Sequence, residues 1–276
     1  MAPEKISLTE EKATLLITLY GKAQESRLPD SLLKDRFAAE AVERIDYDFT
    51  KLRVNRDMMI GLALRAYLFD RWVKAFLKAH GEATVLHLAC GLDSRVFRLA
   101  PGPQVRWFDV DQPEVISLRR RVYPDREGTT LIAASVTEPG WLEALPADRP
   151  TMVVAEGLMP YLPAAEAPRL IERLVQHFPA GEIAFDAYSR LGLKLIQYNP
   201  SIRATGARVH GSLEDPHDFE RKIPGLVLLD DLKAYSPEGY DPAQIARMSR
   251  LARLMIGVFT IFPALGKIGR LLRYGF

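Results

Sequence analysis

Two residues that follow apolar runs have the types and spacing of a nucleoside-binding site. Gly91 comes soon after the run TVLHLA at residues 84–89, and Asp111 stands twenty residues later, directly after the run QVRWFDV at 104–110. A glycine lets the backbone approach a ligand closely. An acidic residue at this distance accepts hydrogen bonds from both ribose hydroxyls. The spacing therefore predicts an adenosine ligand, with a buried strand and a capped helix as the purely structural alternative.

The loop between the two runs favours S-adenosylmethionine over a dinucleotide. A dinucleotide needs the pattern G-x-G-x-x-G so that its pyrophosphate meets a helix N-terminus. The loop ACGLDSR at residues 89–95 contains one glycine only. S-Adenosylmethionine has no phosphate and brings an ammonium and a carboxylate instead. We therefore predict S-adenosylmethionine, with a nicotinamide-dependent oxidoreductase and a non-catalytic binding module as the two rival interpretations.

Two basic residues are candidates for binding the carboxylate of such a ligand. Arg65 lies at the centre of an apolar helical stripe that includes Met58, Leu62 and Phe69. A buried arginine requires an anionic partner, so Arg65 forms either an internal salt bridge or a contact with the ligand. Lys22 lies near the apolar face of an earlier helix, where it either snorkels to solvent or takes the same role.

The helices and strands that position these residues are predicted from the pattern of apolar residues along the chain. Residues 1–80 are expected to form a helical cap or lid, with helices from about Thr9, over about 29–47 and over about 56–80. From residue 81 to 276, short apolar runs alternate with segments of helical length, which predicts a doubly wound, mostly parallel α/β sheet. The strands are expected at 84–89, 104–110, 129–134, 151–156, 182–187, 226–232 and 270–276.

Composition limits the function classes. The 276 residues include 37 basic and 35 acidic ones, a net charge of +2 that gives no general attraction to nucleic acid or anionic membranes. The single cysteine excludes an intrachain disulfide and favours a reducing, cytoplasmic location. The uncharged run at 254–266 is too short to span a bilayer. We expect it to be a buried or lid-like element, with an interfacial helix as the alternative.

Several motifs occur together in one order and carry a family resemblance. The sequence resembles the leucine carboxyl methyltransferase family, in particular its polyketide, tetracenomycin-type O-methyltransferase branch. The resemblance implies a class I, Rossmann-like methyltransferase fold of seven strands. The motifs are TLLITLYGKAQESRLPDSLLKD (14–35), VLHLACGLDSRVFRL (85–99), WFDVDQPEVISLRRRVYP (107–124), AASVTEPGWLEAL (133–145), VVAEGLMPYLP (153–163) and RLLRYGF (270–276).

The resemblance also implies roles for individual residues. Ala89, Cys90 and Gly91 would line the cofactor loop, and Asp111, or alternatively Asp109, would hold the ribose. Arg65 and Lys22 would meet the methionyl carboxylate, Ser135 and Val136 would flank the adenine, and Glu156 would face the methionyl end or cap a turn.

Two residues of this loop raise further questions. Ala89 replaces the family's first glycine, a change that is tolerable with a negative φ. Cys90 is either a small turn residue or a thiol with a pKa lowered by the helix N-terminus.

The acceptor site is expected to follow the fourth and fifth strands, with residues 188–224 as its main segment. Tyr161, Tyr188, Tyr198 and Arg203 are candidates for binding the acceptor. His210 and His217 are candidate bases for a phenol, whereas a carboxylate needs none. For both histidines the alternative is a solvated loop position.

We predict an O-methyltransferase acting on a hydroxyl or carboxyl group of a small aromatic or polyketide-like metabolite. Methylation of a protein C-terminus and a catalytically weak cofactor-binding homologue are the alternatives. We expect no metal, nucleic-acid partner or membrane span, and a monomer or homodimer.

Overall fold

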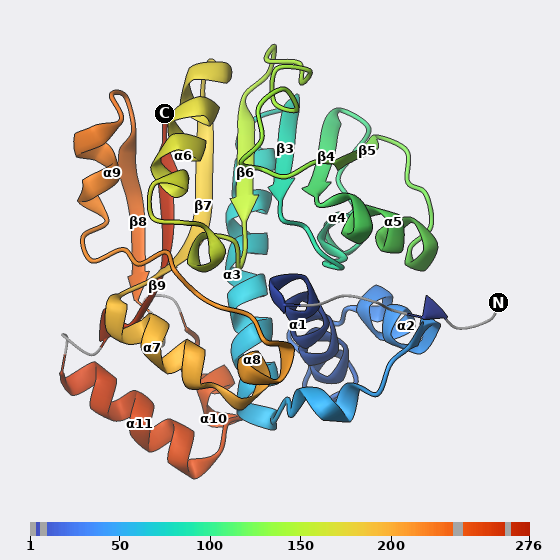
Figure 1. Ribbon diagram of the computed structural model, residues 1–276, viewed down its shortest axis with the longest axis vertical. Helices are drawn as coiled ribbons and strands as arrows, with labels where there is room; N and C mark the ends of the chain where they lie inside the picture. Colours follow the sequence, from blue (N-terminus) through green and yellow to red (C-terminus); the bar gives the residue numbers. More distant parts are fainter. Residues whose placement is uncertain (1–3, 6–9, 234–239, 263–265) are drawn as a thin grey trace.

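Seven strands form one sheet in the order β5-β4-β3-β6-β7-β9-β8 (Figure 1). The structure is a computed structural model that describes residues 4–5, 10–233, 240–262 and 266–276. The strands are β3 (Ala83–Leu88), β4 (Val105–Asp111), β5 (Thr129–Ala133), β6 (Thr151–Ala155), β7 (Gly181–Tyr188), β8 (Val227–Lys233) and β9 (Gly269–Gly275). All seven coincide with the predicted runs to within one or two residues.

The pairing pattern makes the sheet doubly wound. β3 pairs in parallel with both β4 and β6, so the chain moves outward through β4 and β5 and then returns to the other side of β3. β7 continues the parallel set, and β9 is antiparallel to both β7 and β8. This confirms the predicted class, and it places the topological switch point at the carboxyl ends of β3 and β6, where open α/β sheets bind ligands.

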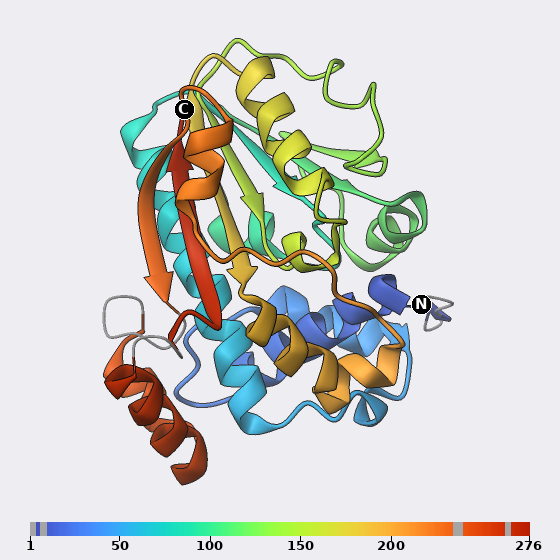
Figure 2. The ribbon, with the colours of Figure 1, turned by 60° about the vertical axis from the view of Figure 1, so that its left-hand side comes forward.

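Each face of the sheet has its own apolar core. α6 (Glu166–His177) and Phe219 of α9 (His217–Lys222) pack with Leu86, Val153 and Phe185 on one face. α3 (Arg56–Ala79) and α4 (Arg95–Leu99) pack on the other face, and Figure 2 shows α3 and α6 on opposite sides of the sheet. Alternate residues of a strand point to opposite faces, so the central strands are buried throughout.

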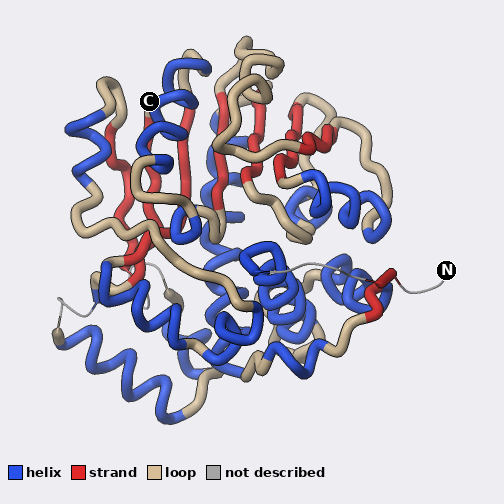
Figure 3. The backbone as a smooth tube through the Cα atoms, in the orientation of Figure 1, coloured by secondary structure: helices blue, strands red, loops and turns tan. Residues whose placement is uncertain are grey.

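A layer of helices lies against the carboxyl edge of the sheet (Figure 3). It contains α1 (Glu10–Ser26), α2 (Arg36–Arg44), η1 (Phe49–Leu52), the first half of α3, α7 (Arg190–Tyr198) and α8 (Pro200–Thr205). α5 (Pro113–Val122) packs against β5, and its Leu118 and Val122 share a core with α1 and α2. The other short elements are the pair β1 (Glu4–Lys5) and β2 (Ile45–Asp46), η2 (Met159–Tyr161) and α10 (Pro242–Ala246).

Two helix predictions differ from the structure. The second helix begins at Arg36, not near residue 29, because Asp35 accepts the backbone N–H of Ala38 and caps it there. Residues 199–224, predicted to be rich in loops, contain α8 and α9. The capping residue proposed for the first helix, Thr9, lies outside the described residues.

α3 packs in the helical layer with its first half and against the sheet with its second half. Its Met58, Leu62 and Arg65 face the carboxyl edge of the sheet, whereas Phe69 and Phe76 enter the core beneath β3 and β4. The boundary placed at residue 80 therefore does not coincide with a division between two cores.

The C-terminal apolar run is not buried as predicted. Its residues 254–261 belong to α11 (Arg250–Ile261), on which Leu254 is 66% exposed and Ile261 is 73% exposed, and its residues 263–265 lie outside the described part of the chain. Among the residues of this helix whose burial is described, Ile256 alone is buried, against the α3 core. None of the helices in the described part of the chain has the length and apolarity needed to cross a membrane.

Candidate cofactor and acceptor site

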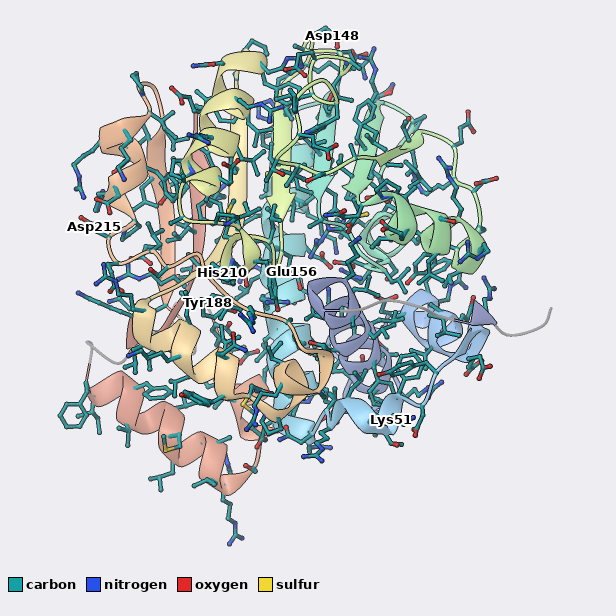
Figure 4. All side chains as sticks on the ribbon, in the orientation of Figure 1. Lys51, Asp148, Glu156, Tyr188, His210 and Asp215 are labelled. Carbon is teal, nitrogen blue, oxygen red and sulfur yellow. The ribbon has the colours of Figure 1, made fainter. Side chains whose placement is uncertain are left out.

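A cavity of about 430 Å³ opens at the topological switch point, between the carboxyl edge of the sheet and the helical layer. The loops after β3, β4, β5 and β6 and the carboxyl end of β7 line it, and so do α1, α3, α7 and α8. Figure 4 shows Glu156 at this edge of the sheet and Asp148 at the opposite edge. The cavity has a charged end beside β3, β4 and β6 and an apolar end beneath α7 and α8.

Asp111, the predicted ribose ligand, lies at the charged end of the cavity. Its side chain lines the cavity, where Oδ2 accepts the Gly91 N–H at 2.7 Å and Oδ1 accepts the Gln112 N–H at 2.7 Å. Burial raises the pKa of this carboxyl above its usual value. Each oxygen keeps a further lone pair for a hydroxyl donor, so the carboxylate is oriented in advance for a vicinal diol.

Asp109, the alternative ribose ligand, does not line the cavity. Its side chain is fully buried and contacts Arg119 Nη2 at 2.6 Å, His87 Nδ1 at 3.1 Å and Trp107 Nε1 at 2.8 Å. Arg119 in turn donates to the carbonyl oxygens of Gly91 and Asp93. Asp109 therefore supports the loop from behind.

The backbone of Ala89 and the thiol of Cys90 differ from what the sequence analysis considered for them. Ala89 has φ +47°, in the left-handed region that costs a residue with a side chain about 1–2 kcal/mol. The negative φ that would make this replacement of glycine harmless is therefore absent. Cys90 lines the cavity but is 2% exposed, and burial raises the pKa of its thiol, so the lowered pKa considered from the sequence is wrong.

Glu156 is the centre of a buried ion network. Its carboxylate contacts Lys22 Nζ at 3.1 Å, Arg65 Nε at 3.2 Å and the guanidinium of Arg95. Burial alone would raise the pKa of Glu156, but the three cations outweigh it and hold that pKa well below its usual range. Glu156 thus does more than cap a turn: it fixes three cations that come from α1, α3 and α4.

Arg65 and Lys22 line the cavity, and both are held by carboxylates of the protein. Arg65 Nη1 contacts Asp186 at 2.9 Å in addition to its contact with Glu156, and Lys22 Nζ contacts Asp93 at 3.0 Å. The internal salt bridge left open for Arg65 is therefore present. A side-chain exposure of 4% for Lys22 excludes the snorkelling alternative.

Carboxylates outnumber cations in this network. The site thus presents net negative charge to a ligand, which suits a molecule that carries an ammonium, a sulfonium and one carboxylate. Among the described residues that ion pairs connect, the cations are Lys22, Arg65, Arg95 and Arg98, and the carboxylates are Asp35, Asp70, Asp93, Glu156 and Asp186.

Ser135 and Val136, predicted to flank an adenine, follow β5 and line the same cavity. Val136 is 7% exposed, and Ser135 Oγ lies 2.9 Å from Thr137 Oγ1. Gly91, with φ +51°, borders the region from the other side, where a Cβ would meet Leu15 Cβ of α1 at 3.3 Å. The residues present thus fit the predicted cofactor along its length.

The apolar end of the cavity contains two of the predicted acceptor residues. Tyr161 and Tyr188 line it together with Leu62, Ile196 and Ile202. The Tyr188 hydroxyl donates to Asp186 at 3.1 Å, and burial followed by the charge of Asp186 raises the pKa of that phenol well above its usual value. Tyr188 therefore stays protonated at neutral pH.

Asp186 is a site residue that the sequence prediction missed. It is 1% exposed at the end of β7, and it accepts the Gly157 N–H at 2.6 Å as well as the Arg65 and Tyr188 contacts. Asp186 thus joins the loop after β6 to both ends of the cavity. The available signal was a carboxylate inside the apolar run EIAFDA.

The other acceptor and base candidates lie away from the cavity. Tyr198 is 73% exposed, Arg203 is exposed on α8, and neither lines the cavity. His210 is also exposed, and its backbone N–H donates to the Pro160 carbonyl. His217 is exposed at the start of α9 and pairs with Glu220. The base role predicted for the two histidines stays a prediction, and neither histidine lines the cavity.

Comparisons with known proteins agree with this geometry. Residues 16–175 match the family described as leucine carboxyl methyltransferase. The chain is 45% identical over 224 residues to the tetracenomycin polyketide synthesis O-methyltransferase TcmP of Streptomyces glaucescens, covering 81% of this chain and 83% of that protein. It is 34% identical to the S-adenosyl-L-methionine-dependent methyltransferase dpfgK of Gibberella zeae, covering 96% and 95%.

Solved structures show the same fold at low identity. A putative methyltransferase from Thermobifida fusca superposes with a TM-score of 0.58 at 17% identity, covering 96% of this chain and 94% of that one. A DUF574 family protein from Streptomyces avermitilis gives a TM-score of 0.59 at 13% identity, covering 96% and 97%. The chain belongs to the leucine carboxyl methyltransferase family and is an S-adenosylmethionine-dependent methyltransferase.

Proposed function

We propose that this member of the leucine carboxyl methyltransferase family methylates a hydroxyl or carboxyl oxygen of a small aromatic or polyketide-like molecule. The carrying observation is the continuity of one cavity from the charged end at Asp111 and Glu156 to the apolar end at Ile196 and Ile202. An apolar chamber with a few polar groups is typical of sites for small molecules. The relative at 45% identity is named for polyketide synthesis and O-methylation.

In this proposal the cofactor lies along the carboxyl edge of the sheet. Asp111 accepts the ribose hydroxyls, Ser135 and Val136 border the adenine, and Glu156 with Arg65 and Lys22 surrounds the methionyl end. When bound, the cofactor would supply a methyl carbon on a sulfonium: the acceptor oxygen would bond to that carbon, in line, as the carbon–sulfur bond breaks and S-adenosylhomocysteine leaves. The protein's contribution is to hold the acceptor oxygen on that axis, which the fixed side chains of Asp186 and Tyr188 favour.

In this proposal the acceptor oxygen ionises without a histidine base from the protein. His87 is the histidine that lines the described cavity, and its Nε2 lies 3.1 Å from Arg95 Nη1 while its Nδ1 lies 3.1 Å from Asp109. An arginine is only a donor, so Nε2 accepts, Nδ1–H donates, and neither nitrogen is available as a base. A carboxylate or an acidic phenol or enol fits this arrangement, because each ionises without help.

Transfer of a labelled methyl group tests the proposal. Purified enzyme is incubated with methyl-labelled S-adenosylmethionine and a panel of aromatic carboxylic acids, polyphenols and β-diketone enols, with a leucine-terminated peptide as the competing class. Mild base then hydrolyses a methyl ester and releases labelled methanol, whereas an aryl ether keeps its label. We expect label in a small aromatic product. Transfer only to the peptide, or only to nitrogen or carbon, contradicts the proposal.

The pH profile separates the two kinds of oxygen. A carboxylate is ionised from about pH 5 upward, so its methylation is expected to change little through neutrality. A phenol with a pKa near 10 is expected to react faster as the pH rises.

We also propose that the enzyme is cytoplasmic, because its single buried cysteine suits a reducing compartment.

A further inference from the structure

α11 presents an exposed apolar face that the proposed function does not use. Leu251, Leu254, Met255, Ile261 and Phe262 are between 46% and 73% exposed. Their spacing of three, four and seven residues places them on one side of the helix, roughly opposite the buried Ile256. Monomeric proteins seldom expose a contiguous apolar surface of this kind unless something binds there.

The N-terminal end of α11 is fixed to the rest of the protein by hydrogen bonds and ion pairs. Ser249 caps the helix by accepting the Ala252 N–H, and it contacts Asp57 of α3 through both its N–H and its hydroxyl at 2.7 Å. The adjacent Arg247 forms ion pairs with Glu25 and Asp30. Figure 2 shows α11 at the lower left, projecting from the body of the molecule. The apolar face is therefore held outward in a fixed direction.

The charged residues of the C-terminal segment that contains α11 all have one sign. Residues 242–276 contain six basic residues and neither aspartate nor glutamate, although the whole chain is nearly balanced. Arg247, Arg270 and Arg273 pair with carboxylates elsewhere in the protein. Arg250 and Arg253 of α11 are exposed, and within the described residues no ion pair neutralises either of them. The apolar face is thus accompanied by uncompensated positive charge.

We propose that α11 is an interfacial helix that docks the enzyme on an anionic membrane surface. An exposed apolar face on a helix that also carries exposed arginines is the pattern of helices that lie in the headgroup region of a bilayer. Anionic lipids supply the negative charge that the C-terminal segment lacks. A second copy of the chain fits less well, because two α11 helices offer each other no carboxylate to pair with Arg250.

Vesicle binding tests the proposal. The full chain is sedimented with vesicles of phosphatidylcholine, with and without about one third phosphatidylglycerol, at low and high salt. We expect binding to the anionic vesicles, weakened by about 0.5 M salt and weak on the neutral ones. Absence of binding to anionic vesicles at low salt by the folded enzyme overturns the proposal.

Variants assign the binding to α11. Leu251→Gln with Leu254→Gln is expected to weaken binding about tenfold or more, and Arg250→Gln with Arg253→Gln to abolish the preference for anionic lipid. Val227→Gln with Leu229→Gln, which changes exposed apolar residues of the edge strand β8, is the matched control and is expected to bind like wild type.

Two outcomes contradict the assignment to α11. One is equal vesicle binding by the α11 leucine variant and its control. The other is a wild-type protein that sediments as a dimer and does not bind vesicles, together with an α11 variant that sediments as a monomer. Folding of each variant is checked by its melting temperature and its affinity for S-adenosylhomocysteine.

Discussion

The two ends of the cavity are built from different parts of the fold. At the cofactor end, carboxylates at or just after the ends of strands are joined by ion pairs to cations from α1, α3 and α4, as Glu156 is to Arg65. At the acceptor end, side chains such as Ile196 and Ile202 come from two short helices and make apolar contacts.

This difference indicates that one end of the cavity binds the cofactor and the other end selects the acceptor. Ion pairs that link α1, α3, β6 and β7 hold the charged end in one arrangement, and charge makes any change there costly. Apolar side chains on α7 and α8 are replaceable by others of similar size, so the acceptor end can be altered without disturbing the cofactor end. Substitutions at the two ends should therefore affect different measured quantities.

The largest effect is expected at Glu156. Glu156→Ala leaves Lys22, Arg65 and Arg95 without their shared carboxylate, so we expect the free energy of unfolding in urea to fall by about 3–5 kcal/mol. The control is Glu166→Ala on α6, whose pair with Arg169 is largely exposed and should cost less than about 1 kcal/mol. Equal losses in the two variants would show that the network stabilises nothing.

Acid is expected to weaken the same end. The pKa values of Glu156 and Asp93 are lowered in the folded protein, because nearby cations outweigh the effect of burial. Folding therefore gains stability from these groups above their unfolded pKa values of about 4, and this gain is lost as the pH falls through the lower folded values. Urea unfolding between pH 7 and pH 3 should show a nearly constant midpoint above about pH 5 and a steep decline below about pH 4. A decline that is complete above pH 5 contradicts this assignment.

Asp111 and Asp109 are expected to separate binding from folding. Asp111→Asn should weaken S-adenosylhomocysteine binding in calorimetry by about 10- to 100-fold, the equivalent of 1.5–3 kcal/mol for hydrogen bonds to a charged group. Asp109→Asn should instead lower the melting temperature and change the dissociation constant much less, since Asp109 is buried behind the loop. The reverse pattern would assign the ribose to Asp109.

A smaller, selective effect is expected at the apolar end. Ile196→Ala enlarges the acceptor chamber, so the KM for the acceptor should rise about tenfold while the affinity for S-adenosylhomocysteine stays constant. Leu195→Ala on the outer side of the same helix, 51% exposed, is the matched control and should change neither quantity. Loss of cofactor affinity in the Ile196 variant would mean that the two ends are not separable.

The smallest effect is a gain in stability. Ala89→Gly removes the cost of a left-handed alanine, partly offset by greater freedom of the unfolded chain, so we expect about 0.5–1 kcal/mol and a melting temperature higher by about 1–4 °C. Ala75→Gly at an exposed position of α3 should cost about 1 kcal/mol. Destabilisation by both substitutions would show that Ala89 is not strained.

The cofactor end was predictable from sequence because its residues stand at fixed offsets from buried strands. Gly91, Asp111 and Glu156 each follow an apolar run, and the ends of parallel strands meet at one edge of a sheet. Arg65 was predicted to need an anionic partner, and it has two. Asp186 was missed because its run was interpreted only as a strand.

The acceptor end was less predictable because nothing in the sequence fixes how residues 199–224 pass over the sheet. The histidines were proposed from their position in that segment alone. The structure takes the segment away from the cavity after α8, where the backbone of His210 and Gly211 bonds to the Pro160 carbonyl. Loop paths depend on tertiary contacts that propensity does not encode.

The length of α3 has a consequence for how the protein unfolds. Its 24 residues run from Asp57, which holds α11, through Arg65 at the cavity to Phe76 beneath the sheet. Its Phe69 and Phe76 share one core with β3, β4 and β6, so we expect residues 81–276 without this helix to fail to fold. The helical layer and the sheet should exchange their slowest amide hydrogens in a single cooperative opening, which makes the intact chain the smallest piece in which either end of the cavity exists.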